Sequence, residues 1–126
     1  METPIIIHGE WEDNYDDPSH PIPSLSALDV EGIKKGGGAD LIIVIASPLG
    51  ADERSRRRLL AKIEIYLKYL DSAEFVEKAG MPTPDNTCII VHLHPESDPE
   101  ILDVIERCKP WVRTKSATLY YLWLEV

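Results

Sequence analysis

The clearest pattern of apolar and polar positions lies between Ala39 and Leu70. Residues 41–46 are apolar and mostly β-branched, and they follow one another without a helical period. Such a run predicts a strand that is buried on both faces. After a short polar turn, apolar residues recur at spacings of three and four, which predicts the apolar face of an amphipathic helix. This face consists of Leu59, Ile63, Tyr66, Leu67 and Leu70.

The predicted helix has clear start and stop signals. Asp52 is a favourable N-cap, so we expect the helix to begin there or one residue earlier. A helix from Asp52 to Ala79 would be about 42 Å long, more than the width of a domain of this size. We therefore predict a break near Asp71–Ser72, followed by a shorter helix over Ala73–Lys78 that ends at Gly80.

Three further segments predict strands. Residues 25–33 alternate loosely, and the glycine-rich turn at residues 34–38 joins them to residues 39–47 in a predicted β-hairpin. These glycines lie between two strands, whereas a phosphate-binding loop would place them between a strand and a helix. Residues 87–93 are apolar on both faces and predict a third strand, and residues 118–126 predict a last, aromatic strand.

A second helix is predicted after the third strand. Residues 97–100 read Ser-Asp-Pro-Glu, which combines a capping box between Ser97 and Glu100 with proline in the first turn. Pro110 either kinks this helix or restarts a short turn. The apolar face of the helix consists of Ile101, Leu102, Ile105 and Cys108.

These elements predict an α+β fold in the order β-β-α-β-α-β. We expect a four-stranded mixed sheet with the two main helices on one face, that is, a two-layer sandwich over residues 25–126. Residues 1–24 are expected to form an acidic, proline-containing N-terminal arm. Two helices cannot cover both apolar faces of such a sheet, so the second face is expected to meet either the arm or a second copy of the protein.

The distribution of charge separates the arm from the rest. The chain of 126 residues has a net charge of −9, and residues 1–33 contain eight acidic residues and no Lys or Arg. An acidic chain of this kind repels phosphate backbones, so we expect no nucleic-acid partner.

The sequence favours a cytoplasmic location. The longest apolar run is too short to cross a bilayer, and the acidic N-terminus lacks the positive charge of a signal peptide, so we expect neither a membrane partner nor export. Cys88 and Cys108 lie in a strand-like and a helix-like stretch, and free buried thiols are the favoured interpretation over a disulfide.

Several of these features occur together in residues 25–126: Leu28-Asp29-Val30 in the first strand, the glycine-rich turn, the long Leu/Tyr helix with its break, the strand that ends at His94-Pro95, and the aromatic last strand. In this combination the chain resembles an uncharacterised family of small bacterial α+β domains of unknown function. The resemblance implies the fold described above and brings no activity, cofactor or catalytic residue with it. The acidic arm lies outside it.

His92 and His94 are the sharpest candidates for chemistry. Residues two apart on a strand point to the same face, so both imidazoles could bind one metal ion. A third ligand would have to come from Glu96, Asp98, His8 or His20, and no spacing selects among them. The simpler interpretation is a pair of half-exposed histidines at the end of a strand.

Four arginines crowd the start of the first helix, where the helix dipole disfavours cations: Arg54, Arg56, Arg57 and Arg58. One hypothesis is an anionic ligand. Another is a contact with the acidic arm, within the chain or between subunits, through Glu10, Glu12, Asp13, Asp16 and Asp17. A solvated basic face is the third interpretation.

The aromatic last strand suggests an interface. Tyr121 and Trp123 share one face, opposite Tyr120, Leu122 and Leu124. One of these sets is expected to lie away from the helices in a dimer contact, and we assign the interface to Tyr121 and Trp123. No nucleophile has a recognisable catalytic setting, and we expect no cofactor and no catalytic residues. The sequence thus favours a non-enzymatic interaction module that forms a homodimer or binds another protein. The alternative is a metal-dependent enzyme that uses His92 and His94.

Overall fold

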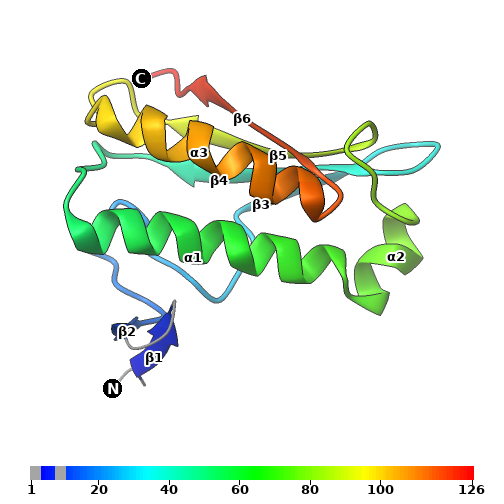
Figure 1. The fold of residues 1–126 in the computed structure, drawn as a ribbon, viewed down its shortest axis with the longest axis horizontal. Coiled ribbons are helices and arrows are strands. Elements are labelled where there is room, and N and C mark those ends of the chain that lie inside the picture. The colour runs from blue at the N-terminus through cyan, green and yellow to red at the C-terminus, as the bar shows by residue number, and fades with distance from the viewer. Residues whose placement is uncertain (1–3, 8–10) are drawn as a thin grey trace.

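The computed structural model describes residues 4–7 and 11–126 and shows an α+β protein (Figure 1). It contains a two-stranded sheet, a four-stranded mixed sheet and three helices within these residues. The strands are β1 (Pro4–Ile7), β2 (Trp11–Asn14), β3 (Val30–Ile33), β4 (Ala39–Ile45), β5 (Thr87–Leu93) and β6 (Thr118–Trp123), and the helices are α1 (Glu53–Leu70), α2 (Ala73–Ala79) and α3 (Glu100–Thr114).

The four-stranded sheet has the order β3-β4-β5-β6. β3 and β4 form the expected antiparallel hairpin, and β5 and β6 each join parallel to the preceding strand. The hairpin turn requires glycine at position 38. Gly38 has a φ of +86°, and a Cβ at this position would lie only 2.0 Å from the carbonyl oxygen of Asn86.

The predicted break in the long helix is confirmed. Asp52 caps α1 and accepts a hydrogen bond from the Ser55 backbone N–H at 3.1 Å. Ser72 caps α2 through the Phe75 N–H at 3.1 Å, and Gly80 follows its last residue with a φ of +79°. The caps divide the apolar pattern into two helices, as the sequence indicated.

The prediction of a strand over residues 25–33 was too long, because β3 begins only at Val30. The segment before it crosses α1, where the ammonium group of Lys62 binds the carbonyl oxygens of Ser24 at 2.7 Å and Ala27 at 2.8 Å. Backbone groups in this segment therefore bind a helix side chain instead of a neighbouring strand. The last strand is also shorter than predicted and ends at Trp123.

The predicted capping box of α3 is wrong. The Ser97 hydroxyl accepts a hydrogen bond from the Leu49 N–H at 3.0 Å, in the loop after β4, so it is not available to the helix. Asp98 accepts from the Glu100 N–H at 2.9 Å instead. Pro110 does not end the helix, which continues to Thr114. Pro110 and Glu106, four residues earlier, are both exposed, so water can reach the carbonyl that lacks its helical partner.

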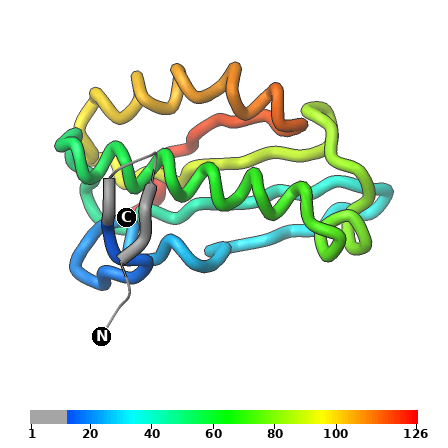
Figure 2. Tube along the Cα trace, turned by 60° about the horizontal axis from the view of Figure 1, so that its bottom comes forward, coloured from blue at the N-terminus to red at the C-terminus, as the bar shows by residue number. Residues whose placement is uncertain are grey.

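Side chains on one side of the sheet form the core with the helices. They alternate along β4 as Leu41, Ile43 and Ile45, all fully buried, and they pack with Leu59 of α1 and Ile105 of α3. In the tube view, α1 and α3 run side by side along the strands (Figure 2). No helix of the described residues is long and apolar enough to cross a membrane.

The end of the arm reaches this core through Ile22, and Leu25 just after the arm joins it. Ile22 and Leu25 are each 1% exposed and join the core cluster. β1 and β2 lie on the side of α1 that faces away from the four-stranded sheet (Figure 1). The arm therefore lies against α1 and leaves the second face of the sheet open.

Candidate functional site

The strand register defines an apolar row across the face of the sheet that points away from α1. Val30 of β3 is paired with Ile42 of β4, Ile42 with Ile90 of β5, and Ile90 with Tyr120 of β6. Adjacent residues along a strand point to the opposite side, and on the central strands β4 and β5 they enter the core. We call the side that carries this row the open face.

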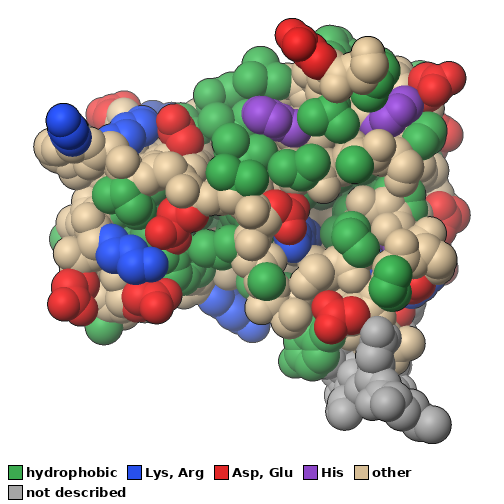
Figure 3. Space-filling model, turned by 180° about the vertical axis from the view of Figure 1, so that it is seen from behind, with side chains coloured by type: hydrophobic (Ala, Val, Ile, Leu, Met, Phe, Trp, Pro, Cys, Tyr) green, Lys and Arg blue, Asp and Glu red, His purple; other side chains and the backbone are tan. Residues whose placement is uncertain are grey.

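A second row runs beside the first and consists of Val44, His92 and Leu122. Val30 at one edge of the open face is 44% exposed, and Leu122 at the other edge is 49% exposed. Hydrophobic side chains gather around a histidine on the back of the molecule (Figure 3). The open face is therefore mainly apolar and reaches the surface at both edges.

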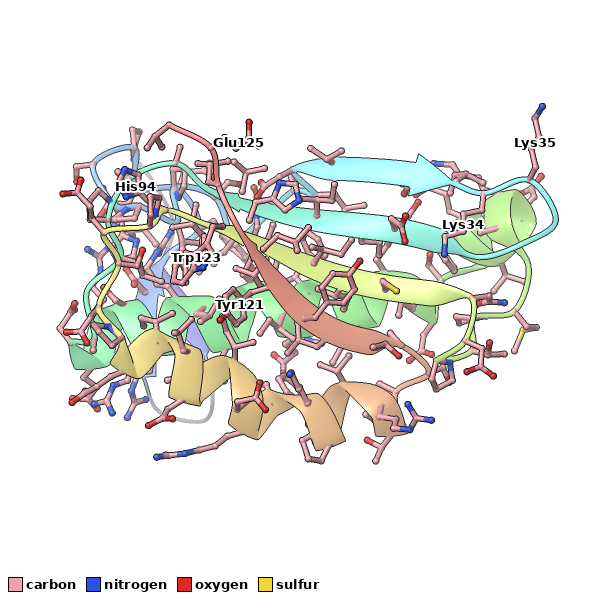
Figure 4. The ribbon with its side chains drawn as sticks, turned by 90° about the horizontal axis from the view of Figure 1, so that it is seen from above. Lys34, Lys35, His94, Tyr121, Trp123 and Glu125 are labelled. Atoms are coloured by element: carbon pink, nitrogen blue, oxygen red, sulfur yellow. The ribbon has the colours of Figure 1, made fainter. Side chains whose placement is uncertain are left out.

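Figure 4 looks onto the open face, with α1 behind the strands. Within the part of the chain that the structure describes, no helix crosses the strands on this side. The C-terminal segment continues from β6 through a hydrogen bond from the Leu124 N–H to the Leu93 carbonyl at 2.8 Å. The face that the helices leave open is thus not closed by the described part of the arm.

Tyr121 and Trp123, the predicted interface pair, lie on the other side of β6. Tyr121 pairs with the buried Val91 and is packed against the core, and Trp123 pairs with the buried Leu93. Their rings meet edge to face, with centroids 5.3 Å apart. Trp123 is 50% exposed, but it shares the side of the sheet that carries α1 and α3. On the open face, β6 contributes Tyr120 and Leu122 instead.

His92 and His94 have different surroundings. His92 lies in the second row of the open face, whereas His94 is buried at the end of β5, where its Nδ1 accepts a hydrogen bond from the Glu96 N–H at 3.0 Å. His20 lies elsewhere, with its Nε2 3.0 Å from the hydroxyl of Ser55 on α1. His8 falls outside the described residues. Among the described residues, no group of three or more His, Cys, Asp or Glu side chains could hold a metal ion.

Two of the four crowded arginines hold the arm. Arg54 binds both carboxylate oxygens of Asp13 at 3.0 Å and one oxygen of Asp17 at 2.6 Å. The fully buried Arg58 lies 3.2 Å from Asp13 and donates to the carbonyl oxygens of Ile22 at 2.8 Å and Asn14 at 2.7 Å. The buried guanidinium therefore joins backbone and side-chain groups of the arm at one point.

The carboxylates of this contact are held in their charged form. Burial raises the pKa of Asp13, but hydrogen bonds from Arg54, the Asn14 N–H and Arg58 outweigh it and leave the pKa below its usual value. The pKa of Asp17 is lowered by the Ser19 hydroxyl and then by Arg54. The contact therefore persists at neutral pH.

Two further residues on the same side of α1 as Arg54 and Arg58, Lys62 and Tyr66, bind the segment before β3, and the sequence analysis did not predict these contacts. Lys62 binds the Asp29 carboxylate at 2.9 Å in addition to its two carbonyl contacts. The Tyr66 hydroxyl accepts from the Asp29 N–H at 2.8 Å and donates to the Ile42 carbonyl at 2.7 Å. With Arg54 and Arg58, these residues form a stripe at a spacing of four, which places them on one side of a helix. That spacing was the signal available in the sequence.

The other two arginines, Arg56 and Arg57, line a surface groove between α1 and α3. The groove has a volume of about 600 Å³, and its lining also includes Leu60, Val104, Arg107 and Trp111. Arg57 donates two hydrogen bonds to Glu53, at 2.8 and 3.1 Å. Arg56 is exposed.

The cysteines are not activated nucleophiles. Burial raises the pKa of the Cys108 thiol to about 11. The pKa of Cys88 is also raised, first by burial and then by the charge of Asp40. Both cysteines are free, as the sequence indicated, and at neutral pH both are neutral thiols.

Comparison with known proteins assigns no family to the chain. No protein-family model matches it, no curated protein matches it and no solved structure matches it. The resemblance of residues 25–126 to a family of small bacterial domains therefore stays a prediction, and the functional argument depends on the chain's own surfaces.

Proposed function

We propose that this protein is a non-enzymatic interaction module that forms a homodimer through the open face of its sheet. In this proposal residues 25–126 form a two-layer sandwich with one side available for a partner. The observation that supports it is the unbroken apolar row from Val30 through Ile42 and Ile90 to Tyr120.

A second copy fits this face better than the arm does. The described part of the arm is already bound to α1 through Arg54, Arg58 and Lys62. Two such faces could pack sheet on sheet at about 10 Å, with the apolar rows interdigitating. Two-fold dimers are the commonest soluble oligomers, and their interface is built from the same patch on both subunits.

The charges of the open face lie at its margin. Asp40 is adjacent to the apolar row and forms an ion pair with Lys34 at 3.3 Å. His92 is the only ionisable side chain in the second row. Burial of the apolar rows in a dimer would therefore not enclose an unpaired carboxylate, which would be costly.

The oligomeric state of a Leu122→Lys variant tests the proposal. Leu122 is half exposed in the single chain, so a lysine there is tolerated by the subunit but would place a charge inside the dimer interface. Met81→Lys is the matched control, because Met81 is 72% exposed and lies in the loop between α2 and β5. Sedimentation velocity should show a dimer for the wild type and for Met81→Lys, and a monomer for Leu122→Lys.

Two results would contradict the homodimer. The first is a wild-type protein that sediments as a monomer at millimolar concentration. The second is a Leu122→Lys variant that dimerises as tightly as Met81→Lys while keeping a native circular dichroism spectrum. Among the described residues no third ligand joins His92 and His94, which favours the interaction module over the metal-dependent alternative.

A further inference from the structure

The groove between α1 and α3 combines an apolar floor with a polar lining of three arginines and Glu53, which is paired with Arg57. Leu60, Val104 and Trp111 line the groove and are partly buried against the core, so they form a firm apolar surface. The groove does not include any residue of the two apolar rows on the open face. A ligand here would occupy a separate surface from the proposed dimer interface.

Two guanidinium groups face this groove from opposite helices. Arg56 comes from α1 and Arg107 from α3. In the described part of the chain, neither makes a hydrogen bond or an ion pair, whereas Arg54, Arg57 and Arg58 all do.

The lack of partners is notable in this protein. The chain has 22 acidic residues and 13 basic ones, so a free carboxylate is easier to find than a free guanidinium. Glu100 and Asp103 line a neighbouring pocket together with Arg56 and Arg107, yet they form no ion pair with either arginine in the described structure. Glu53, the carboxylate in the groove itself, pairs with Arg57, so Arg56 and Arg107 are two cations in one lining that no described ion pair neutralises, and such a pair favours an anion.

We propose that the groove binds a small organic anion whose charged group lies between Arg56 and Arg107 and whose apolar body lies on Leu60, Val104 and Trp111. A guanidinium presents a planar fork of donors that matches a carboxylate, phosphate or sulfonate group. A volume of about 600 Å³ is that of a small-molecule site.

The floor of the groove supports binding and not reaction. Cys108 also lines it, and its thiol is buried and neutral at physiological pH. A neutral thiol extends the apolar surface under the ligand and does not attack it. The anion is therefore expected to bind reversibly.

Anilinonaphthalene sulfonate is a suitable probe, because it joins a sulfonate to an aromatic body and becomes fluorescent in apolar sites. We expect saturable binding that shifts the indole N–H signal of Trp111 in a ¹H–¹⁵N spectrum. Arg56→Gln and Arg107→Gln should each weaken binding about tenfold, the size expected for one charge-assisted hydrogen bond. Arg113→Gln is the matched control on α3, since Arg113 is exposed and does not line the groove.

Competition identifies the ligand class. Phenyl phosphate should displace the probe at lower concentration than inorganic phosphate does, because it adds an apolar body. Displacement by hexaglutamate at still lower concentration would overturn the proposal in favour of an acidic peptide. Equal weakening by Arg113→Gln, or a Trp111 signal that does not move, would overturn it as well.

The Leu122→Lys variant separates this proposal from the homodimer. The probe should shift the Trp111 signal with unchanged affinity in that variant, whatever its oligomeric state. If the shift disappears in Leu122→Lys, the probe is bound through the open face and the groove proposal fails, while the dimer proposal stands.

Discussion

Replacement of Arg58 by Met removes the buried cation that joins the arm to α1. The methionine keeps most of the apolar stem but loses the donors to Ile22 and Asn14 and the ion pair with Asp13. The carbonyl oxygens of Ile22 and Asn14 would then lose the hydrogen bonds that Arg58 donates to them. Asp13 would keep its bonds to Arg54.

The expected loss of stability follows from burial. The Arg58 side chain is 0% exposed and the Asp13 side chain 7% exposed, so water cannot replace the lost contacts without displacing the arm. Removal of one partner from a buried charged contact costs about 3–5 kcal/mol, and the retained Arg54 bonds place the expected value near the lower end, at about 3 kcal/mol. Ile22 and Leu25 would become exposed if the arm were released, which adds to the loss.

Urea unfolding monitored by circular dichroism measures this free energy. Arg56→Met is the matched control, because Arg56 is exposed and has no partner among the described residues, and it should change the free energy of unfolding by less than about 0.5 kcal/mol. Limited proteolysis should cut residues 15–29 faster in Arg58→Met than in the control. A loss below about 1 kcal/mol with unchanged proteolysis would show that the arm does not depend on Arg58.

Three other substitutions test particular contacts. The Nδ1 of His20 accepts from the Ile22 N–H, and burial together with the charges of Arg58 and Arg54 lowers the pKa of His20 below 6.5. The free energy of unfolding should therefore fall as the pH drops below 6.5, because the unfolded chain binds the proton more readily. His20→Asn keeps an acceptor and should flatten this pH dependence in urea titrations. Gly38→Ala should lower the melting temperature by several degrees, because the added Cβ meets a backbone carbonyl and the φ is positive. Tyr66→Phe should cost about 1–2 kcal/mol in urea unfolding, because one hydroxyl serves two backbone groups. A pH slope that persists in His20→Asn, or wild-type stability in either of the other variants, would refute the corresponding contact.

Elements with local signals were predictable from the sequence. The bounds of α1, α2 and β5 followed from apolar spacing, from the caps at Asp52 and Ser72, and from Gly80. Each of these signals acts within a few residues, so no knowledge of the tertiary structure is needed. Ser97 shows the opposite case, because a distant N–H at Leu49 takes the hydroxyl that the local pattern assigned to a helix cap.

The composition of the open face depends on how the strands pair with one another, and the sequence alone does not give this pairing. Alternation along β6 separates Tyr121 from Tyr120, but it does not say which of the two faces the helices. The pairing of Val91 with Tyr121 decides this, since Val91 is buried in the core. In the same way, Arg56 and Arg107 are distant in sequence and become a pair only when α1 and α3 pack side by side.

The position of the arm also bears on how an acidic chain could self-associate through the open face, as proposed above. The eight acidic residues of positions 1–33 include Asp13 and Asp17, which Arg54 and Arg58 neutralise on the side of α1 away from the sheet. They also include Asp29, which Lys62 neutralises. A helix layer and a sheet layer then separate the Asp13 and Asp17 contacts from the open face. At physiological salt the Debye length is about 8 Å, so solvent-exposed charges on the far side of α1 act only weakly, through the surrounding solvent, on a second copy at the open face. On the open face itself, the carboxylate of Asp40 is paired with Lys34, which would reduce its repulsion between two copies in the proposed dimer.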